Sequence, residues 1–262
     1  MVDETNPKPD HRKGIYLLPN LLTTAALFSG FYAIIASIHD RFEAAAVAIF
    51  VSMILDGLDG RVARMTNTQS DFGAEYDSLA DLVSFGLAPA LVMYEWSLSS
   101  LGKIGWSAAF LYTVFAALRL ARFNTQVGKV DKAYFQGLAS PAAAAVMSGF
   151  VWVGQDYQFH GTDLAPFALV ITIIAGLLMV SRIRYHSFKD LDLKGRVPFV
   201  TVLIVVIIFV LISIDPPQVL FLCFLLYLIS GPVLTLKQLR QRRATRRLSE
   251  NPEQTPPKSK AD

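Results

Sequence analysis

Four aspartates in two closely spaced pairs are the residues of this sequence best suited to chemistry. Asp56 and Asp59 are three positions apart, and Asp77 and Asp81 are four positions apart. These spacings place each pair on one face of a helix. Both pairs adjoin long apolar runs, where a carboxylate is costly and therefore indicates function. Two such helices facing each other would direct four carboxylates at one point, as a site for one or two hard divalent cations requires.

Small and basic residues within the same stretch indicate the class of ligand. Gly57, Gly60 and Gly73 remove side chains beside the aspartates and so permit close approach of a ligand or a neighbouring helix. Arg64 offers a guanidinium suited to phosphate oxygens. Divalent cations beside this arginine favour a pyrophosphate. A carboxylate not fully used in coordination can act as general base on a hydroxyl. If the stretch lies at the cytoplasmic edge of a membrane, these residues predict transfer from a lipid-linked pyrophosphate to a small water-soluble acceptor.

The composition indicates that membrane-spanning helices position these residues. The chain has 262 residues, of which 53% are apolar and only 17% are charged, whereas a soluble globular domain carries about 25% charged residues. The predicted fold is an all-α, polytopic membrane helical bundle of about eight transmembrane helices. The expected spans are 17–38, 43–64, 78–96, 104–121, 138–155, 164–181, 198–214 and 217–236.

The distribution of basic residues predicts the orientation of the bundle. With the N-terminus in the cytoplasm, every Lys and Arg except Arg41 and Lys103 falls on the cytoplasmic side. Both termini are therefore expected in the cytoplasm of a cell (inner) membrane protein, with the aspartates at the cytoplasmic surface. We expect a polar tail at 1–13, a membrane domain at 14–236, and a basic, disordered tail at 237–262 that contacts anionic headgroups. No nucleic-acid partner is expected.

The aspartate stretch also resembles a known family signature. Asp56-x-x-Asp59-Gly60-x-x-Ala63-Arg64, then eight residues, then Gly73-x-x-x-Asp77-x-x-x-Asp81 is similar to the pattern of the CDP-alcohol phosphatidyltransferases, and every fixed position is filled. Four other segments resemble the membrane-embedded phosphatidylserine synthases within that family. They are PNLLT at 19–23, LRLARFN at 118–124, FQGLASPAAA at 135–144 and MVSRIRYHSFK at 179–189.

The resemblance implies a reaction and a set of site residues. CDP-diacylglycerol would donate a phosphatidyl group to the hydroxyl of L-serine and release CMP, within a homodimer embedded in membrane lipid. Asp56, Asp59, Asp77 and Asp81 would bind two divalent metals, Mg²⁺ or Mn²⁺, and Asp81 would also be the base. The residues expected to contact the CDP-lipid are Asn20, Thr23, Gly60, Arg64 and Ser70. On their residue types alone, Asn20 and Thr23 would be helix caps.

The acceptor pocket follows from the chemistry of serine, which brings a carboxylate and an ammonium. We expect Arg119 or Arg122, together with Asn124 or Gln136, to bind the carboxylate. Snorkelling at the membrane interface is the alternative role of these arginines. Arg182 and Arg184 are the next candidates.

Two other functions compete with this interpretation. The same chemistry could serve another acceptor, such as glycerol 3-phosphate, inositol phosphate or choline, and the basic residues would suit a phosphorylated one. A cation transporter would use the aspartates as its ion site, but inverted repeats and helices broken at the midplane are not evident in the sequence. A non-catalytic scaffold does not explain four aspartates together with Arg64.

Overall fold

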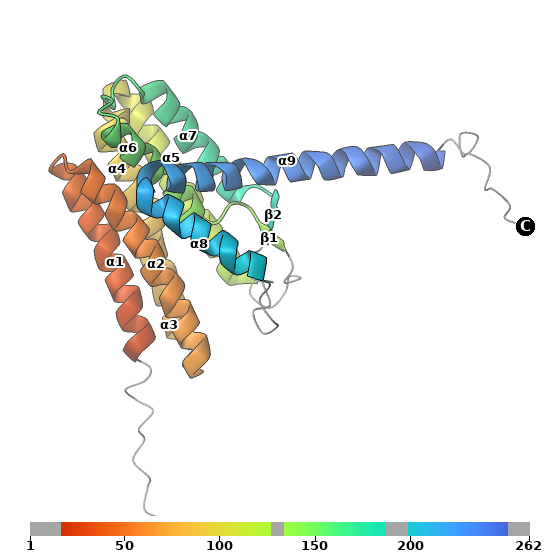
Figure 1. Cartoon of the computed structure of the whole chain (residues 1–262), viewed down its shortest axis with the longest axis horizontal. Helices are drawn as coiled ribbons and strands as arrows, with labels where there is room; N and C mark the ends of the chain where they lie inside the picture. Colours follow the sequence, from red (N-terminus) through yellow and green to blue (C-terminus); the bar gives the residue numbers. More distant parts are fainter. Residues whose placement is uncertain (1–16, 127–133, 187–198, 251–262) are drawn as a thin grey trace, which may run out of the picture.

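The computed structural model describes residues 17–126, 134–186 and 199–250. Helices make up almost all of these residues (Figure 1). The elements in chain order are α1 (Leu17–Ile38), α2 (Phe42–Thr66), α3 (Asp71–Asp81), the π-helix η1 (Leu82–Leu87), α4 (Ala88–Trp96), the 3₁₀-helix η2 (Leu98–Leu101), α5 (Lys103–Gln126), β1 (Tyr134–Gln136), α6 (Ser140–Asp156), α7 (Ala165–Val180), β2 (Arg184–His186), α8 (Phe199–Ile214) and α9 (Pro216–Glu250).

The helical character expected from the sequence is confirmed, and each expected span corresponds to a helix. Because α3, η1 and α4 run on without a break, they form one rod from residue 71 to residue 96. Within the described residues, four helices are long and apolar enough to cross a membrane: Leu17–Ile38, Asp71–Trp96, Lys103–Thr125 and Pro216–Lys237. Ala165–Val180 is apolar but shorter. The number of crossings and the orientation of the termini stay predictions.

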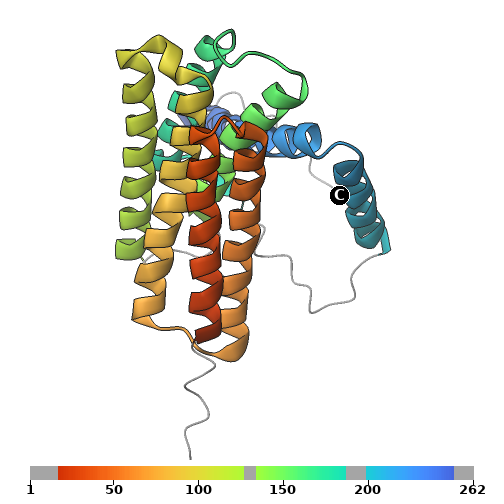
Figure 2. The same ribbon diagram turned by 90° about the vertical axis from the view of Figure 1, so that its left-hand side faces the viewer.

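Small residues allow the first helices to approach closely. Helices α1 and α2 pack side by side with α3 next to them (Figure 2). Serine hydroxyls join their backbones: Ser29 donates to the carbonyl of Ala48 at 2.7 Å, and Ser52 donates to the carbonyl of Ala26 at 2.8 Å. Close approach and interhelical hydrogen bonds are the means by which membrane helices associate. They fix α2, which carries the first aspartate pair, against α1.

The π-helix η1 begins directly after Asp81 and packs against the middle of α1. Ser84 of η1 donates a hydrogen bond to the Ala26 carbonyl at 3.2 Å. Gly30 permits this contact, since a Cβ there would lie between 2.5 and 2.9 Å from atoms of Ser84. Single π-turns within α-helices occur frequently at functional sites. Here the wide turn sets the position of the second aspartate pair relative to α1.

Two three-residue strands are the exception to the all-α prediction. Strands β1 and β2 pair antiparallel, with Phe135 opposite Tyr185. Gly137 follows β1 with a φ of 79°, and its N–H donates to the carbonyl of Ile183 at 2.8 Å. Glycine adopts such a backbone conformation without steric cost. The pairing joins the segment that precedes α6 to the segment that follows α7.

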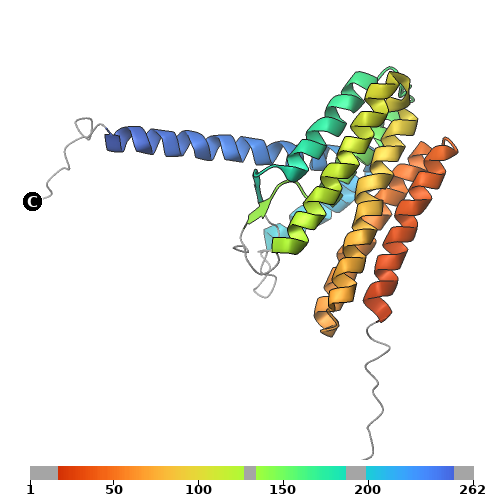
Figure 3. The ribbon, with the colours of Figure 1, turned by 180° about the vertical axis from the view of Figure 1, so that it is seen from behind.

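Helix α9 corrects the boundary expected for the C-terminal tail. The helix runs without a break from Pro216 to Glu250, so residues 237–250 are helical rather than disordered. This stretch holds no glycine or proline and is rich in arginine, glutamine and leucine, which favour helix. Figures 1 and 3 show α9 leaving the bundle on the side where β1 and β2 lie. The expected tails at 1–13 and beyond residue 250 lie outside the described residues.

Candidate active site

A tight turn between α2 and α3 brings the two aspartate pairs together. Asn67 ends α2 in the left-handed conformation with a φ of 52°, and its N–H donates to the Ala63 carbonyl. Asparagine tolerates this conformation at the end of a helix. Ser70 then begins α3 as its N-cap, accepting a hydrogen bond of 3.0 Å from the N–H of Gly73. The chain reverses within a few residues, so the end of α2 faces the start of α3.

The carboxylates meet as their spacing predicts. One carboxylate oxygen each from Asp56, Asp59 and Asp77 lies within 4.8 Å of the other two. Asp81 adjoins this group, because its side chain is hydrogen-bonded to that of Asp56. Asp59 is 5% exposed, and the other three side chains are partly buried. Four acidic groups from two helices are therefore concentrated in a half-buried space.

This group of side chains fits a divalent cation. Carboxylate oxygens are the preferred ligands of Mg²⁺ and of similar hard ions. Oδ1 of Asp77 is buried and has no hydrogen-bond partner among the described residues, and a buried polar atom of this kind requires a partner. Closely spaced carboxylates also repel one another, which a bound cation relieves. The donors, their charge and the unpartnered oxygen all favour a metal site.

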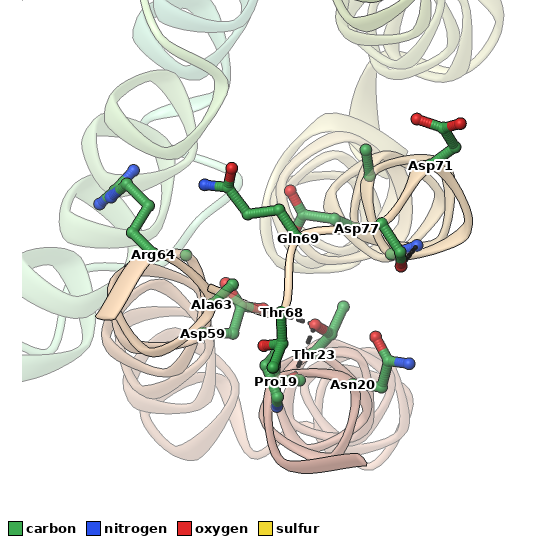
Figure 4. Close-up of a pocket in the computed structure, with 14 residues that line it drawn as sticks. Pro19, Asn20, Thr23, Asp59, Ala63, Arg64, Thr68, Gln69, Asp71 and Asp77 are labelled. Carbon is green, nitrogen blue, oxygen red and sulfur yellow. Dashed lines mark hydrogen bonds between the residues drawn. The ribbon is translucent and has the colours of Figure 1, made fainter. Parts of the chain in front are cut away.

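Helix α1 contributes the group that holds Asp59. The Thr23 hydroxyl lies 2.6 Å from Oδ2 of Asp59 and 3.1 Å from the carbonyl of Pro19 (Figure 4). Thr23 is buried, at 4% exposure. Because α1 already begins at Leu17, Asn20 and Thr23 lie inside the helix, and the alternative role of these residues as caps is wrong. Thr23 instead orients a carboxylate of the candidate metal site.

A pocket of about 430 Å³ opens beside the aspartates. It contains all five residues expected to contact a CDP-lipid, and in Figure 4 Arg64 and Asp71 lie at opposite sides of it. The lining residues are Pro19, Asn20, Thr23, Asp59, Gly60, Ala63, Arg64, Thr68, Gln69, Ser70, Asp71, Gly73, Ala74 and Asp77. Five of these residues were not predicted as site residues from the sequence: Pro19, Thr68, Gln69, Asp71 and Ala74. The position of Thr68 and Gln69, in the polar turn between Arg64 and Asp77, is the signal that could have found them.

The glycines in this region have different surroundings. A Cβ on Gly60 would meet no protein atom within 4 Å, so its missing side chain leaves space for a ligand and not for a neighbouring helix. A Cβ on Gly73 would lie 3.1 Å from Oγ of Ser70 and 3.5 Å from Oδ1 of Asn20. A side chain at Gly73 would therefore crowd the N-cap hydroxyl of Ser70. Gly60 keeps one wall of the pocket open beside Asp59.

The expected acceptor residues lie on the α5 side of the aspartates, apart from the pocket. Arg119 is partly buried and within electrostatic reach of Asp81 and of Arg122. Asn124 exchanges hydrogen bonds with Ser78 on α3, at 3.1 and 3.2 Å. The backbone of Gln136 lies in β1 opposite Arg184, and the side chains of both lie outside the described residues. Arg182 is exposed. The fold therefore places the Arg119 guanidinium, on α5, under the electrostatic influence of Asp81.

Comparison with known proteins gives one consistent family. The family model described as CDP-alcohol phosphatidyltransferase matches residues 16–181. A Helicobacter pylori (strain ATCC 700392 / 26695) protein named CDP-diacylglycerol–serine O-phosphatidyltransferase is 39% identical over 218 residues, covering 83% of this chain and 90% of its own length. Proteins of the same name from Bacillus subtilis (strain 168) and Mycobacterium tuberculosis (strain ATCC 25618 / H37Rv) are 35% identical over 173 residues and 44% identical over 151 residues. The match to the Bacillus subtilis protein covers 66% of this chain and 91% of that protein. The match to the Mycobacterium tuberculosis protein covers 55% of this chain and 52% of that protein.

Proposed function

The chain belongs to the CDP-alcohol phosphatidyltransferase family, and on this premise we propose that it makes phosphatidylserine. The phosphatidyl group of CDP-diacylglycerol is transferred to the hydroxyl of L-serine, with release of CMP. One observation carries the proposal: carboxylate oxygens of Asp56, Asp59 and Asp77 converge within 4.8 Å beside a pocket lined by Gly60 and Arg64. The relatives named for serine as acceptor support the choice of acceptor.

The aspartates hold the metal in this proposal. Asp56, Asp59, Asp77 and Asp81 would bind two ions, Mg²⁺ or Mn²⁺, through oxygen ligands. When bound, these ions neutralise the pyrophosphate and stabilise the departing phosphate of CMP. Thr23 keeps the Asp59 carboxylate in position by its hydrogen bond of 2.6 Å.

The pocket residues hold the nucleotide end of the lipid. Gly60 lets the pyrophosphate approach the helix backbone, and the Arg64 guanidinium binds phosphate oxygens by charge-assisted hydrogen bonds. Asn20, Thr23 and Ser70 line the same pocket and supply further polar groups. These contacts orient the phosphorus atom that bears the diacylglycerol group toward the side of the site where Asp81 lies.

Asp81 is the general base. Its carboxylate accepts the hydroxyl proton of serine as the serine oxygen attacks that phosphorus. The new bond joins this oxygen to phosphorus, and the bond from phosphorus to the oxygen of the CMP phosphate breaks. The Arg119 guanidinium near Asp81 binds the serine carboxylate, with Arg122, Asn124 and Gln136 as further candidates. An acceptor anchored next to the base has its hydroxyl where the proton is removed.

The location of the site is also a proposal. The pocket lies at the end of the bundle formed by the start of α1 and the turn between α2 and α3. Placing this end in the cytoplasm of a cell (inner) membrane agrees with the distribution of Lys and Arg. Serine and CMP then exchange with the cytoplasm while the acyl chains stay in the bilayer. The family resemblance further implies a homodimer, which the mass of the detergent-solubilised protein would test.

The proposed function is tested by following CMP release. Purified protein receives CDP-diacylglycerol with Mg²⁺ or Mn²⁺ and, in separate reactions, serine, glycerol 3-phosphate, inositol phosphate or choline. We expect release with serine and matching formation of phosphatidylserine. Release with glycerol 3-phosphate alone would move the assignment to a different acceptor, and no release with any acceptor would reject the transferase assignment for this chain.

A further inference from the structure

Two buried serines from different helices donate hydrogen bonds to the same backbone carbonyl of α1. The hydroxyl of Ser52 on α2 lies 2.8 Å from the carbonyl oxygen of Ala26, and the hydroxyl of Ser84 on η1 lies 3.2 Å from it. Both serines and Ala26 are buried. The carbonyl of Ala26 is therefore a joint at which α1, α2 and η1 are fastened together.

Each of these serines lies one helical turn from an aspartate pair. Ser52 precedes Asp56 by four residues on α2, and Ser84 follows Asp81 by three residues in the rod formed by α3, η1 and α4. Residues three or four apart in a helix are neighbours on its surface. The Ala26 joint therefore lies one turn deeper in the bundle than both aspartate pairs.

The wide turn η1 is also held from the side of α5. Pro89 lies four residues after Phe85 and has no N–H, so it cannot donate the usual helical hydrogen bond to the carbonyl of Phe85. The hydroxyl of Tyr112 on α5 donates to this carbonyl instead, at 3.0 Å. A Cβ on Gly86 would lie 3.1 Å from the Cβ of Ala116 on α5. Since η1 is fixed between α1 and α5, a change at the Ala26 joint acts directly on the aspartates that precede η1.

We propose that Ser52 and Ser84 are positioning residues, which hold the two aspartate pairs at the separation that a divalent cation requires by sharing the carbonyl of Ala26. The inference rests on the proposed function, in which the aspartates bind metal, and extends it to residues outside the pocket. Oxygens of three of these carboxylates converge within 4.8 Å, and their mutual repulsion favours separation of the helices that carry them. A joint that resists this separation keeps the ligands in place before the metal binds, which lowers the cost of ordering them.

Binding of Mn²⁺ to the detergent-solubilised full chain, without either substrate, tests this inference. Binding is followed by the loss of the electron paramagnetic resonance signal of free Mn²⁺. Ser52→Ala and Ser84→Ala each remove one hydrogen bond, which predicts about a twofold to tenfold rise in the Kd for Mn²⁺. The Mn²⁺ concentration for half-maximal CMP release should rise by a similar factor. Where an alanine variant does not accumulate, Ser52→Cys, whose thiol is a weak donor, carries the same expectation.

Ser29→Ala is the matched control. Ser29 is also a buried serine that donates across the contact of α1 with α2, to the carbonyl of Ala48 at 2.7 Å, but this bond does not involve η1. The thermal midpoint of Ser29→Ala should fall by about 2–4 °C, as for Ser52→Ala, because each loses one buried hydrogen bond. The Kd for Mn²⁺ should stay unchanged in Ser29→Ala. Equal rises in this Kd for the two variants would indicate general loosening of the helices and would overturn the inference.

A double-mutant cycle tests whether the two serines act through one joint. Because either substitution already releases the joint, the double variant of Ser52→Ala with Ser84→Ala should bind Mn²⁺ about as weakly as the weaker of the single variants. Effects that multiply would show that each serine acts alone and would overturn the inference. Wild-type protein without saturable Mn²⁺ binding would overturn the metal site of the proposed function as well. Saturable binding by the wild type, with an unaltered Kd in both serine variants, would overturn the inference alone.

Discussion

The Thr23 hydroxyl and the Asp59 carboxylate are joined by a hydrogen bond of 2.6 Å between helices α1 and α2. Both side chains are buried, at 4% and 5% exposure. A hydrogen bond to a charged group is stronger than one between neutral groups, and it strengthens further where water is excluded. The first helix therefore takes part in the aspartate site by orienting one of its carboxylates.

Replacing Thr23 by valine should weaken metal activation. The change keeps the shape of the side chain but removes a hydrogen bond to a charged group, worth about 1.5–3 kcal/mol. That energy corresponds to about a tenfold to hundredfold loss. We expect the Mg²⁺ or Mn²⁺ concentration for half-maximal CMP release to rise accordingly. Titration of the metal at saturating CDP-diacylglycerol measures the effect.

Thr24→Val is the matched control for this prediction. Thr24 is exposed and bonds to the carbonyl of Asn20 at 2.7 Å and to the hydroxyl of Tyr76 at 2.9 Å, without contacting an aspartate. Its metal titration should match that of the wild type. Equal behaviour of the two valine variants would show that Thr23 does not orient a metal ligand.

Gly60→Ala should weaken the binding of CDP-diacylglycerol without lowering the stability of the protein. A Cβ at this position meets no protein atom within 4 Å, and alanine stabilises a helix interior relative to glycine by about 0.5–1 kcal/mol. The thermal midpoint in detergent should therefore rise or stay constant. The KM for CDP-diacylglycerol should rise, because the methyl group projects into the pocket.

Gly57→Ala is the control, since Gly57 also has open space around it but does not line the pocket. It should gain stability without losing affinity for the lipid. A Gly60→Ala variant with unchanged KM would remove Gly60 from the nucleotide contacts.

Much of this site follows from residue spacing alone. Separations of three and four residues placed Asp56 with Asp59 and Asp77 with Asp81 on helix faces, and three of these side chains meet within 4.8 Å. The helices also lie where the apolar runs predicted them. These features are local, so the periodicity of a single helix is enough to show them.

Features that depend on contacts between distant segments could not be predicted in the same way. The bond from Thr23 to Asp59 links residues 36 positions apart, and the pairing of β1 with β2 joins two connecting segments. The π-turn after Asp81 leaves no mark in the apolar pattern. The helical extension of α9 was missed because its charge suggested disorder, although its residues favour helix.

Gly30→Ala should destabilise the bundle. The added Cβ would lie between 2.5 and 2.9 Å from atoms of Ser84, and it would force α1 away from η1. Overpacking of this kind costs about 1–3 kcal/mol. The thermal midpoint in detergent should fall, while Gly57→Ala should not lower it. An unchanged midpoint for Gly30→Ala would contradict the close contact of these helices.

Arg122→Ala tests whether Arg122, rather than Arg119, binds the carboxylate of serine. Arg122 lies within electrostatic reach of Arg119 on the same helix. If it binds serine, the KM for serine should rise by about tenfold or more, as loss of a charge-assisted hydrogen bond predicts. Arg182→Ala, which removes an exposed arginine, should change it little. An unaltered KM for serine in Arg122→Ala would leave Arg119 as the main anchor.

The proposed reaction is tested most sharply by comparing serine-dependent CMP release by wild-type protein and by Asp81→Asn. Asparagine keeps the shape of the side chain but cannot accept the proton of the serine hydroxyl as a carboxylate does. We expect wild-type protein to release CMP when serine is added with Mg²⁺ or Mn²⁺. Asp81→Asn should give no turnover, while its thermal midpoint in detergent matches that of the wild type. A fully active Asp81→Asn protein would contradict the role of Asp81 as general base, and wild-type protein that does not respond to serine would contradict the proposed reaction.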